Sequence, residues 1–172
     1  ALIYIPYDSA GAHTVLQTCR DAGVKVINID NVVTEDDYEL VDGIIASDNT
    51  QLGYLSGQWV AENHPDGANI LIAHLQTAES CIINVDGFWQ GITENTDNPD
   101  AFVEVQVVEG GGDTNVTFNA VSDALQAHDD IDVIYCINDT SALGAVQAVE
   151  EAGKTGEIDI LGKDGAPIGK HA

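Results

Sequence analysis

Short apolar runs alternate with amphipathic stretches from one end of the chain to the other. Apolar runs of four to eight residues predict buried strands, and apolar positions at helical spacing predict helices between them. The predicted strands are 2–5, 24–29, 43–46, 68–74, 102–108, 131–137 and 158–161, and the predicted helices are 9–22, 49–63, 80–95, 113–127 and 140–152. Strands that alternate with helices indicate βαβ units, so we expect an α/β fold with parallel sheets and flanking helices.

Capping residues stand at the expected ends of several predicted helices. Ser9, Asp48 and Asp113 precede or open apolar periodic segments, as side chains that accept hydrogen bonds from the first helical N–H groups do. Gly23 and Gly153 follow two other segments, where a left-handed C-cap is common. The local signals therefore agree with the hydrophobic pattern.

In the second predicted helix, four apolar residues recur at helical spacing, and Gly53 and Gly57 would permit close approach to a neighbour. We expect these apolar residues to form a stripe against a sheet, and Trp59 to be a core residue rather than one that stacks on a ligand. The stripe consists of Leu52, Leu55, Trp59 and Val60.

The stretch from Asn31 to Asp42 is polar, acidic and without periodicity. It separates a short βαβ piece from the longer alternating run. This position predicts an interdomain crossover. A length of 172 residues is compatible with one domain or with two small ones.

The chain is strongly acidic, with 5 Lys and Arg against 29 Asp and Glu and a formal net charge of −24. No Lys or Arg occurs between Lys25 and Lys154. Nucleic-acid backbones and anionic membrane surfaces are bound by clustered basic residues, so we exclude both as partners of this segment. The acidity predicts a solvated, self-repelling surface and a monomer.

The termini and the cysteines add little chemistry. No run has the length of a membrane span, and the chain begins inside an apolar run without Met or a leader, which predicts that it is part of a longer product. The spacing of Cys19, Cys81 and Cys136 fits no zinc or C-x-x-C motif, so we expect small buried hydrophobic side chains.

Polar residues follow most of the predicted strands, at the edge where an open parallel sheet binds its ligands. Carboxylates and amides at such places suit the hydroxyls of a sugar or polyol. Each group also has a structural explanation, because Asp and Asn cap helices or form turns and His74 ends a strand as many structural histidines do. The segments are 7–9, 30–31, 74–77, 138–139 and 163–165.

Several ordered strings carry a resemblance to a known family. They are V-I-N-I-D at 26–30, I-A-S-D-N at 45–49, G-F at 87–88, N-D-x-x-A-L-G-A at 138–145 and L-G-K-D-G at 161–165. In this order they resemble the type 1 periplasmic sugar-binding proteins, with the ribose-binding group nearest. The resemblance implies a periplasmic binding protein-like I fold, with two Rossmann-like lobes joined by a hinge and a ligand trapped between them.

On that template the chain is incomplete. Residues 1–30 would be a remnant of the amino-terminal lobe, 31–47 the interdomain crossover, 48–161 the carboxy-terminal lobe and 162–172 the hinge return.

The resemblance also implies ligand-binding roles for individual residues. Asp30, Asn138 and Asp164 match positions at which the family recognises sugar hydroxyls. Asn31 and Asn84 stand where the family has arginines. The exchange removes strong charge-assisted donors, so the ligand need not be ribose.

Two further positions depart from the ribose-binding group. Gly112 and Lys163 fall where it places ring-stacking aromatics. Lys163 brings a cation into an acidic cleft, either to pair with Asp30 or Asp164 or to meet an anionic ligand group.

Three functions remain open at this point. The first is an extracytoplasmic solute-binding protein, periplasmic or a membrane-anchored lipoprotein, that hands a sugar or polyol to the membrane permease of an ABC importer without a cofactor. The second is the effector-binding domain of a lactose-repressor-type regulator, whose DNA-binding part would lie upstream. The third, an enzyme using Asp30, Asp139, Asp164 and His74, is disfavoured because the sequence contains no G-x-G-x-x-G, P-loop or G-x-S-x-G motif.

Overall fold

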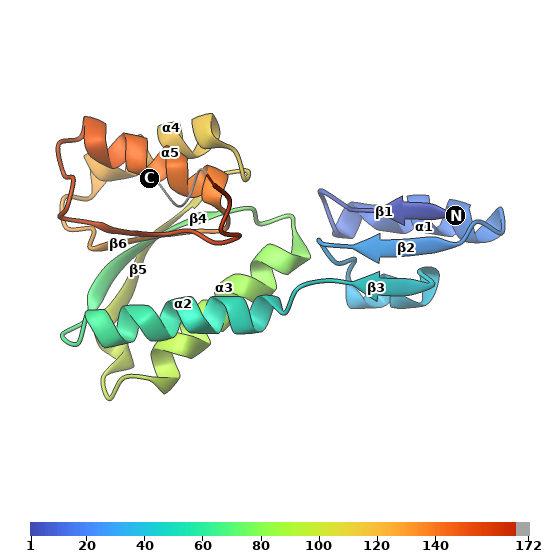
Figure 1. Ribbon diagram of the computed structural model, residues 1–172, viewed down its shortest axis with the longest axis horizontal. Coiled ribbons are helices and arrows are strands. Elements are labelled where there is room, and N and C mark those ends of the chain that lie inside the picture. The colour runs from blue at the N-terminus through green and yellow to red at the C-terminus, as the bar shows by residue number, and fades with distance from the viewer. Residues whose placement is uncertain (168–172) are drawn as a thin grey trace.

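Two separate parallel sheets organise the chain (Figure 1). The structure is a computed structural model, and it describes residues 1–167. The first sheet has the order β1-β2-β3, with strands Leu2–Tyr4, Val26–Ile29 and Gly43–Ile45. The second has the order β5-β4-β6-β7, with strands Phe102–Glu109, Ala68–His74, Val133–Cys136 and Asp159–Leu161. The predicted α/β fold with parallel sheets is confirmed.

The helices lie close to their predicted positions. The α-helices are α1 His13–Asp21, α2 Asn49–Asn63, α3 Glu79–Glu94, α4 Thr114–Ala127 and α5 Asp139–Glu151, and the 3-10 helices are η1 Ala10–Ala12, η2 Glu35–Leu40 and η3 Pro99–Ala101. Asp48 caps α2 by accepting from Gln51 N, and Asp113 caps α4 by accepting from Val116 N. Ser9 stands before η1 but its side chain does not cap that helix, and α1 begins only at His13.

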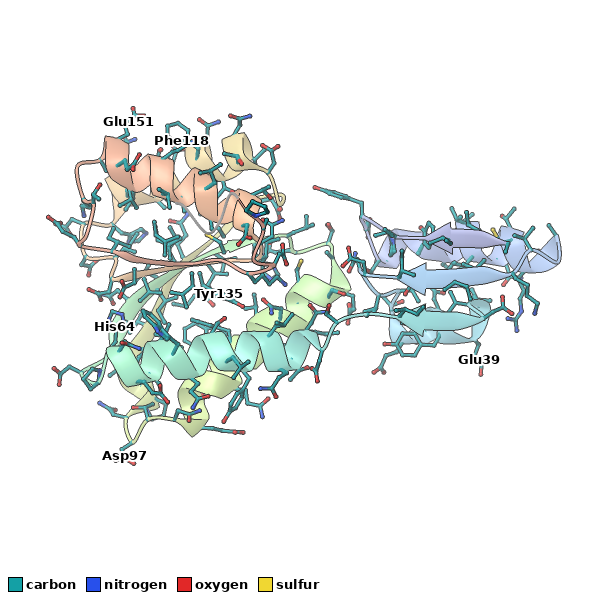
Figure 2. All side chains as sticks on the ribbon, viewed as in Figure 1. Glu39, His64, Asp97, Phe118, Tyr135 and Glu151 are labelled. Carbon is teal, nitrogen blue, oxygen red and sulfur yellow. The ribbon has the colours of Figure 1, made fainter. Side chains whose placement is uncertain are left out.

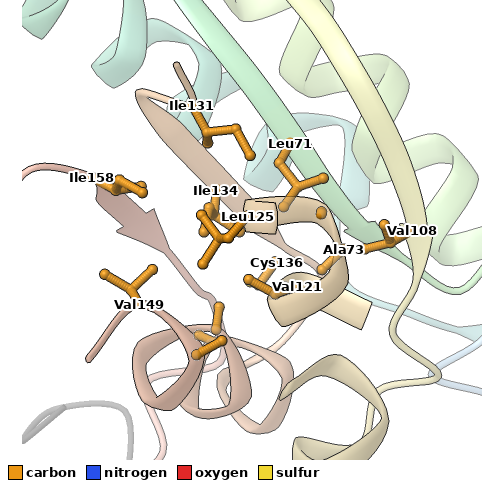
Figure 3. Packing of buried hydrophobic residues seen from close by; sticks show 14 residues of the cluster. Leu71, Ala73, Val108, Val121, Leu125, Ile131, Ile134, Cys136, Val149 and Ile158 are labelled. Carbon is orange, nitrogen blue, oxygen red and sulfur yellow. The ribbon is translucent and has the colours of Figure 1, made fainter. Parts of the chain in front are cut away.

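The second sheet is covered on both faces, α2 and α3 on one side and α4 and α5 on the other (Figure 1). Along β4, Ile70 and Ile72 belong to the cluster of α2 and α3, whereas Leu71 and Ala73 pack toward α4 and α5 (Figure 3). A central parallel strand reads as a continuous apolar run for this reason. This lobe contains most of the hydrophobic core.

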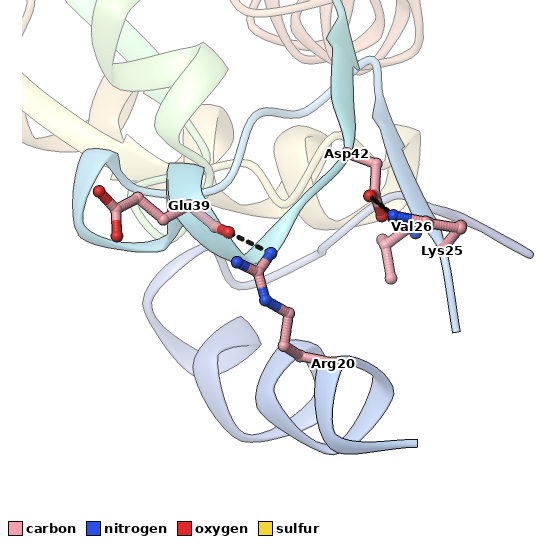
Figure 4. Close-up of polar contacts among 5 residues, drawn as sticks. All are labelled: Arg20, Lys25, Val26, Glu39 and Asp42. Carbon is pink, nitrogen blue, oxygen red and sulfur yellow. Dashed lines mark hydrogen bonds and ion pairs between the residues drawn. The ribbon is translucent and has the colours of Figure 1, made fainter. Parts of the chain in front are cut away.

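The segment between β2 and β3 differs from its prediction as an interdomain crossover. It joins two neighbouring parallel strands of the first sheet, and the chain passes to the second lobe only between Ile45 and Asn49. Val33 and Val41 are buried against the sheet, although they stand among acidic residues in the sequence. Arg20 Nη1 donates to the Glu39 carbonyl, and Asp42 accepts from Lys25 Nζ and Val26 N (Figure 4).

The apolar stripe expected on α2 does not cover a sheet. Leu55 and Trp59 are 52% and 41% exposed, and only Val60 of the four residues is buried. Gly53 and Gly57 instead let α2 pack closely against α3, which agrees with the close approach expected from the sequence. A Cβ at Gly57 would lie 1.9 Å from the Phe88 carbonyl oxygen. Because the glycine face makes the contact, the larger side chains point away from it.

The first sheet is covered on one face only within residues 1–167. Leu2, Tyr4 and Val26 pack with α1, whereas Ile3 and Ile45, on the opposite face, are 70% and 66% exposed. Parallel sheets are ordinarily buried on both faces, so this isoleucine face is an unusual apolar surface.

We expect Gly57→Ala to destabilise the second lobe strongly. The added methyl group would meet the α3 backbone, which cannot rotate away as a side chain can. Overpacking typically costs about 1 to 3 kcal/mol, and we expect a clash with backbone to lie at the upper end of this range. Chemical denaturation measures the loss. Gly11→Ala is the control, because its Cβ would meet only the exposed Asp8 side chain, and an equal effect of both substitutions would contradict the packing argument.

Candidate ligand-binding site

A cavity of about 440 Å³ lies where the carboxyl ends of strands from the two sheets face each other. Tyr7 and Asp30 line it from the first lobe, and Asn138 and Asp164 line it from the second. Of the six residues predicted to bind a ligand, five line this cavity: Asp30, Asn31, Asn138, Lys163 and Asp164. Residues that are far apart in the sequence are therefore brought together at one place.

Asp30 and Asp164 share an uncommon backbone conformation. They have φ angles of 63° and 89° and are the non-glycine residues with positive φ within residues 1–167. Asp tolerates this region better than most residues, but the conformation still stores strain, which is frequent at functional sites. Asp30 follows β2 directly, and Asp164 lies three residues after β7. The cavity is thus lined by one strained aspartate that follows β2 and one that follows β7.

The electrostatics of the second lobe's edge are acidic. Burial raises the pKa of the Asp164 carboxyl, Lys163 opposes the shift, and the charges of Asp139 and Asp30 add to it. Asp139 Oδ2 accepts a hydrogen bond of 2.6 Å from Ala166 N and so positions the segment after β7. Among the described residues around the cavity, Lys163 is the single Lys or Arg.

Asn138 caps a helix and also lines the cavity. Its Oδ1 accepts from Ser141 N at 2.8 Å and caps α5. Its Nδ2 makes a long contact of 3.4 Å with the Gly112 carbonyl, and the residue also lines the cavity. These bonds to the protein fix the orientation of the amide at the cavity wall.

Asn84 lies in a different place from the one predicted. It is fully buried in α3 and is absent from the cavity lining. Its Oδ1 accepts a 2.6 Å hydrogen bond from the hydroxyl of Tyr135, which Figure 2 shows beside α2, and its Nδ2 donates to the Asn49 carbonyl. The Asn84 amide, shorter than the arginine side chain of the resemblance, therefore joins α3 to β6 and to the beginning of α2.

Asn31 lines the cavity, but its side chain is used by the protein. The residue is 9% exposed, its Nδ2 donates to the Pro6 carbonyl and its Oδ1 accepts from Ser80 N. Both polar atoms of the Asn31 side chain are therefore bonded to the protein, which does not support the predicted ligand contact.

Tyr7 lines the cavity, whereas His74 does not. Tyr7 is 68% exposed and lines the cavity; it follows β1 at the edge where ligand contacts were expected, although the resemblance assigned it no role. His74 lies outside the lining, and its Nδ1 accepts from Leu75 N. Burial lowers the pKa of His74, which agrees with a structural, neutral imidazole.

Cys81 lines the cavity, and burial raises the pKa of its thiol, which favours the protonated form. Within residues 1–167, three or more His, Cys, Asp or Glu side chains nowhere gather in a way that could hold a metal ion. In the same part of the chain, no helix is both long and apolar enough to cross a membrane.

Comparison with known proteins gives one family. The model of the periplasmic binding protein domain matches residues 1–172. The ribose import binding protein of Salmonella typhimurium is 28% identical over 172 residues, covering 99% of this chain and 55% of the relative, and the D-allose-binding periplasmic protein of Escherichia coli is 25% identical. The chain thus spans about half the length of these curated relatives. The resemblance seen in the sequence is confirmed.

Solved structures agree in fold. A Mycobacterium smegmatis protein in complex with β-D-fucofuranose has 28% identity and a TM-score of 0.88, covering 99% of this chain and 57% of its own. The Caulobacter myo-inositol binding protein, bound to myo-inositol, has 25% identity and a TM-score of 0.85, covering 97% and 57%.

We expect Asp164→Asn to raise the free energy of unfolding at neutral pH. The folded state holds the aspartate with a raised pKa, so ionisation opposes folding, and stability falls as the pH rises through that pKa. The difference between the two proteins should disappear below the ordinary Asp pKa of about 3.9. Denaturant unfolding at a series of pH values measures it. Asn also tolerates positive φ, so the backbone is preserved; a benefit that is constant with pH would contradict the electrostatic cause.

Proposed function

Because this chain belongs to the family of periplasmic binding protein domains, we propose that it binds a monosaccharide or polyol in the cavity between its two lobes. Two strained aspartates, one that follows β2 of the first sheet and one that follows β7 of the second, carry the proposal. Carboxylates accept strong hydrogen bonds from hydroxyl groups, and two of them on opposite walls suit a ring with hydroxyls on both sides. The cavity volume lies within the range of small-molecule sites.

The ligand that we propose is uncharged. Among the described residues, two carboxylates, those of Asp30 and Asp164, line the cavity against the single cation Lys163, and the whole chain has a net charge of −24. An anionic ligand would meet repulsion that one lysine does not offset. Tyr7 adds an exposed aromatic ring, which offers an apolar surface to the C–H face of a sugar.

The biological role that we propose is solute capture for an ABC importer, outside the cytoplasmic membrane and with a membrane permease as partner. The relatives support it, since their names describe ribose import and periplasmic allose binding. A lactose-repressor-type regulator is less well supported, because a strongly acidic domain disfavours approach to DNA. Anchoring as a lipoprotein and a monomeric state are parts of the same proposal.

The division into lobes is also proposed. We assign residues 1–45 to part of an amino-terminal lobe, since β3 pairs with β2, and this moves the proposed boundary from residue 31 to residues 46–48. The exposed isoleucine face and the greater length of the relatives support a lobe that is larger than the part seen here. Residues 48–161 form the carboxy-terminal lobe, and of the proposed hinge return at 162–172, residues 168–172 lie outside the described residues.

Thermal unfolding with a panel of pentoses, hexoses, polyols and their acidic derivatives tests the ligand class. A ligand at 100 times its Kd adds about 2.7 kcal/mol to the stability of the folded state, so a neutral sugar that binds should raise the Tm clearly. A shift with acidic derivatives alone would contradict the uncharged ligand and point to Lys163. No shift with any compound would overturn the proposed sugar site.

We expect Asp30→Asn to weaken binding of the sugar identified by that panel roughly 10- to 100-fold, because a charge-assisted hydrogen bond becomes a neutral one. Asn fits the positive φ of this position, so the fold should persist. Titration calorimetry measures the Kd. Asp36→Asn is the matched control, since it removes the same charge from an exposed position of η2 that does not line the cavity. Equal effects of the two substitutions would argue against a contact at Asp30.

A further inference from the structure

The relative position of the two lobes rests on non-covalent contacts. Within residues 1–167 the chain crosses between the sheets once, between Ile45 and Asn49. Figure 1 shows the loop from β4 to α3 reaching the ends of β1 and β2. At this place, residues of the first lobe and the beginning of α3 are joined by a set of hydrogen bonds that includes buried side chains.

Ser9 contributes one half of this set. It is 2% exposed, and its N–H donates to the Thr77 carbonyl at 3.0 Å. Its Oγ donates to the Val32 carbonyl at 2.7 Å and accepts from Glu79 N at 3.1 Å. The hydroxyl expected to cap its own helix therefore bonds to a helix of the other lobe.

Ser80 and Asn31 contribute the other half. Asn31 Oδ1 accepts from Ser80 N at 3.0 Å. Ser80 Oγ accepts from Val32 N at 3.0 Å and donates to the Asp30 carbonyl at 3.1 Å. The same hydroxyl thus helps to hold the backbone of Asp30, whose side chain we assign to the ligand.

The beginning of α3 needs partners from outside its own sequence. Ala78 stands at the N-cap and has no side chain that could accept a hydrogen bond. The first N–H groups of a helix have no partner within the helix, and they are usually capped by a polar residue just before it. Here Ser9 and Asn31 of the first lobe cap the N–H groups of Glu79 and Ser80. The cap forms only when the two lobes are together.

We propose that Ser9, Asn31 and Ser80 form an interlobe latch, and that they are positioning residues which set ligand affinity through the arrangement of the two lobes. The coupling to affinity rests on the proposed function. A ligand held by Asp30 and Asp164 needs both lobes in this arrangement, so the apparent Kd rises as the latched fraction of the free protein falls. Asn31, which stands where the ribose-binding group has an arginine, acts on the lobes instead of the sugar.

Ser80→Ala and Ser9→Ala test the latch in the full chain, with Ser122→Ala of α4, remote from the cavity and the latch, as matched control. Three measurements are made: hydrogen exchange of the Glu79 and Ser80 amides, the radius of gyration of the ligand-free protein by X-ray scattering, and the Kd for the sugar identified above. We expect both latch variants to exchange these amides faster and to expand. Their affinity should fall roughly five- to thirtyfold through lost hydrogen bonds.

The outcomes separate the latch from the proposed function. Unchanged exchange and size in the latch variants overturn the latch, even if a sugar binds. Expansion with an unchanged Kd overturns its coupling to binding. Asp30→Asn should lower the affinity for the sugar without expanding the ligand-free protein. A loss of affinity together with expansion should be confined to the serine variants of the latch.

If no sugar binds, the proposed function fails, and the exchange and scattering results still decide whether the latch exists. Should Ser80→Ala fail to fold, Ser9→Ala decides, since it removes a single hydroxyl outside any helix.

Discussion

The hydrogen bonds between the beginning of α3 and the ends of β1 and β2 decide the shape of this protein. The chain crosses between the lobes once in its described part, so their orientation depends on non-covalent contacts such as these. Ser9 and Asn31 supply the cap that Ala78 cannot give to α3. The cavity exists between the lobes because these contacts hold the carboxyl ends of both sheets toward each other.

Polar residues at this edge divide into two groups by what their side chains bind. Asn84 and Asn31 are used by the protein itself, one to join α3 to α2 and β6, the other to join the lobes. Asp30 and Asp164 instead stand in strained backbone and face the cavity. Asn138 belongs to both groups, because its cap on α5 orients the amide that lines the cavity. A network that satisfies the buried amides leaves the aspartates available for a ligand.

Charge has a consistent meaning across the molecule. A net charge of −24 makes the lobes repel each other, and salt and solvent reduce this repulsion only in part. The interlobe contacts are made by serines, an asparagine and backbone groups, which carry no charge and so add nothing to the repulsion. The acidic surface and the neutral latch are therefore compatible, and the carboxylates that face the cavity favour a hydroxyl-rich, uncharged ligand.

The sequence by itself determined the parallel α/β architecture, the approximate bounds of its strands and α-helices, the family, and the gathering of Asp30, Asn138 and Asp164 at one edge. Hydrophobic periodicity and strand ends are local properties, and the topology of parallel sheets turns them into a common edge. It did not determine how Ser9, Asn31 and Asn84 are used, because the partners of these side chains are 23 to 70 residues away. The exposure of Trp59 could not be predicted either, because helical spacing alone does not say which face of a helix packs against a neighbour. The face of α2 that contacts the α3 backbone is the one with Gly53 and Gly57. Tertiary structure decided these points because hydrogen bonds and close packing depend on distances in space that no local pattern contains.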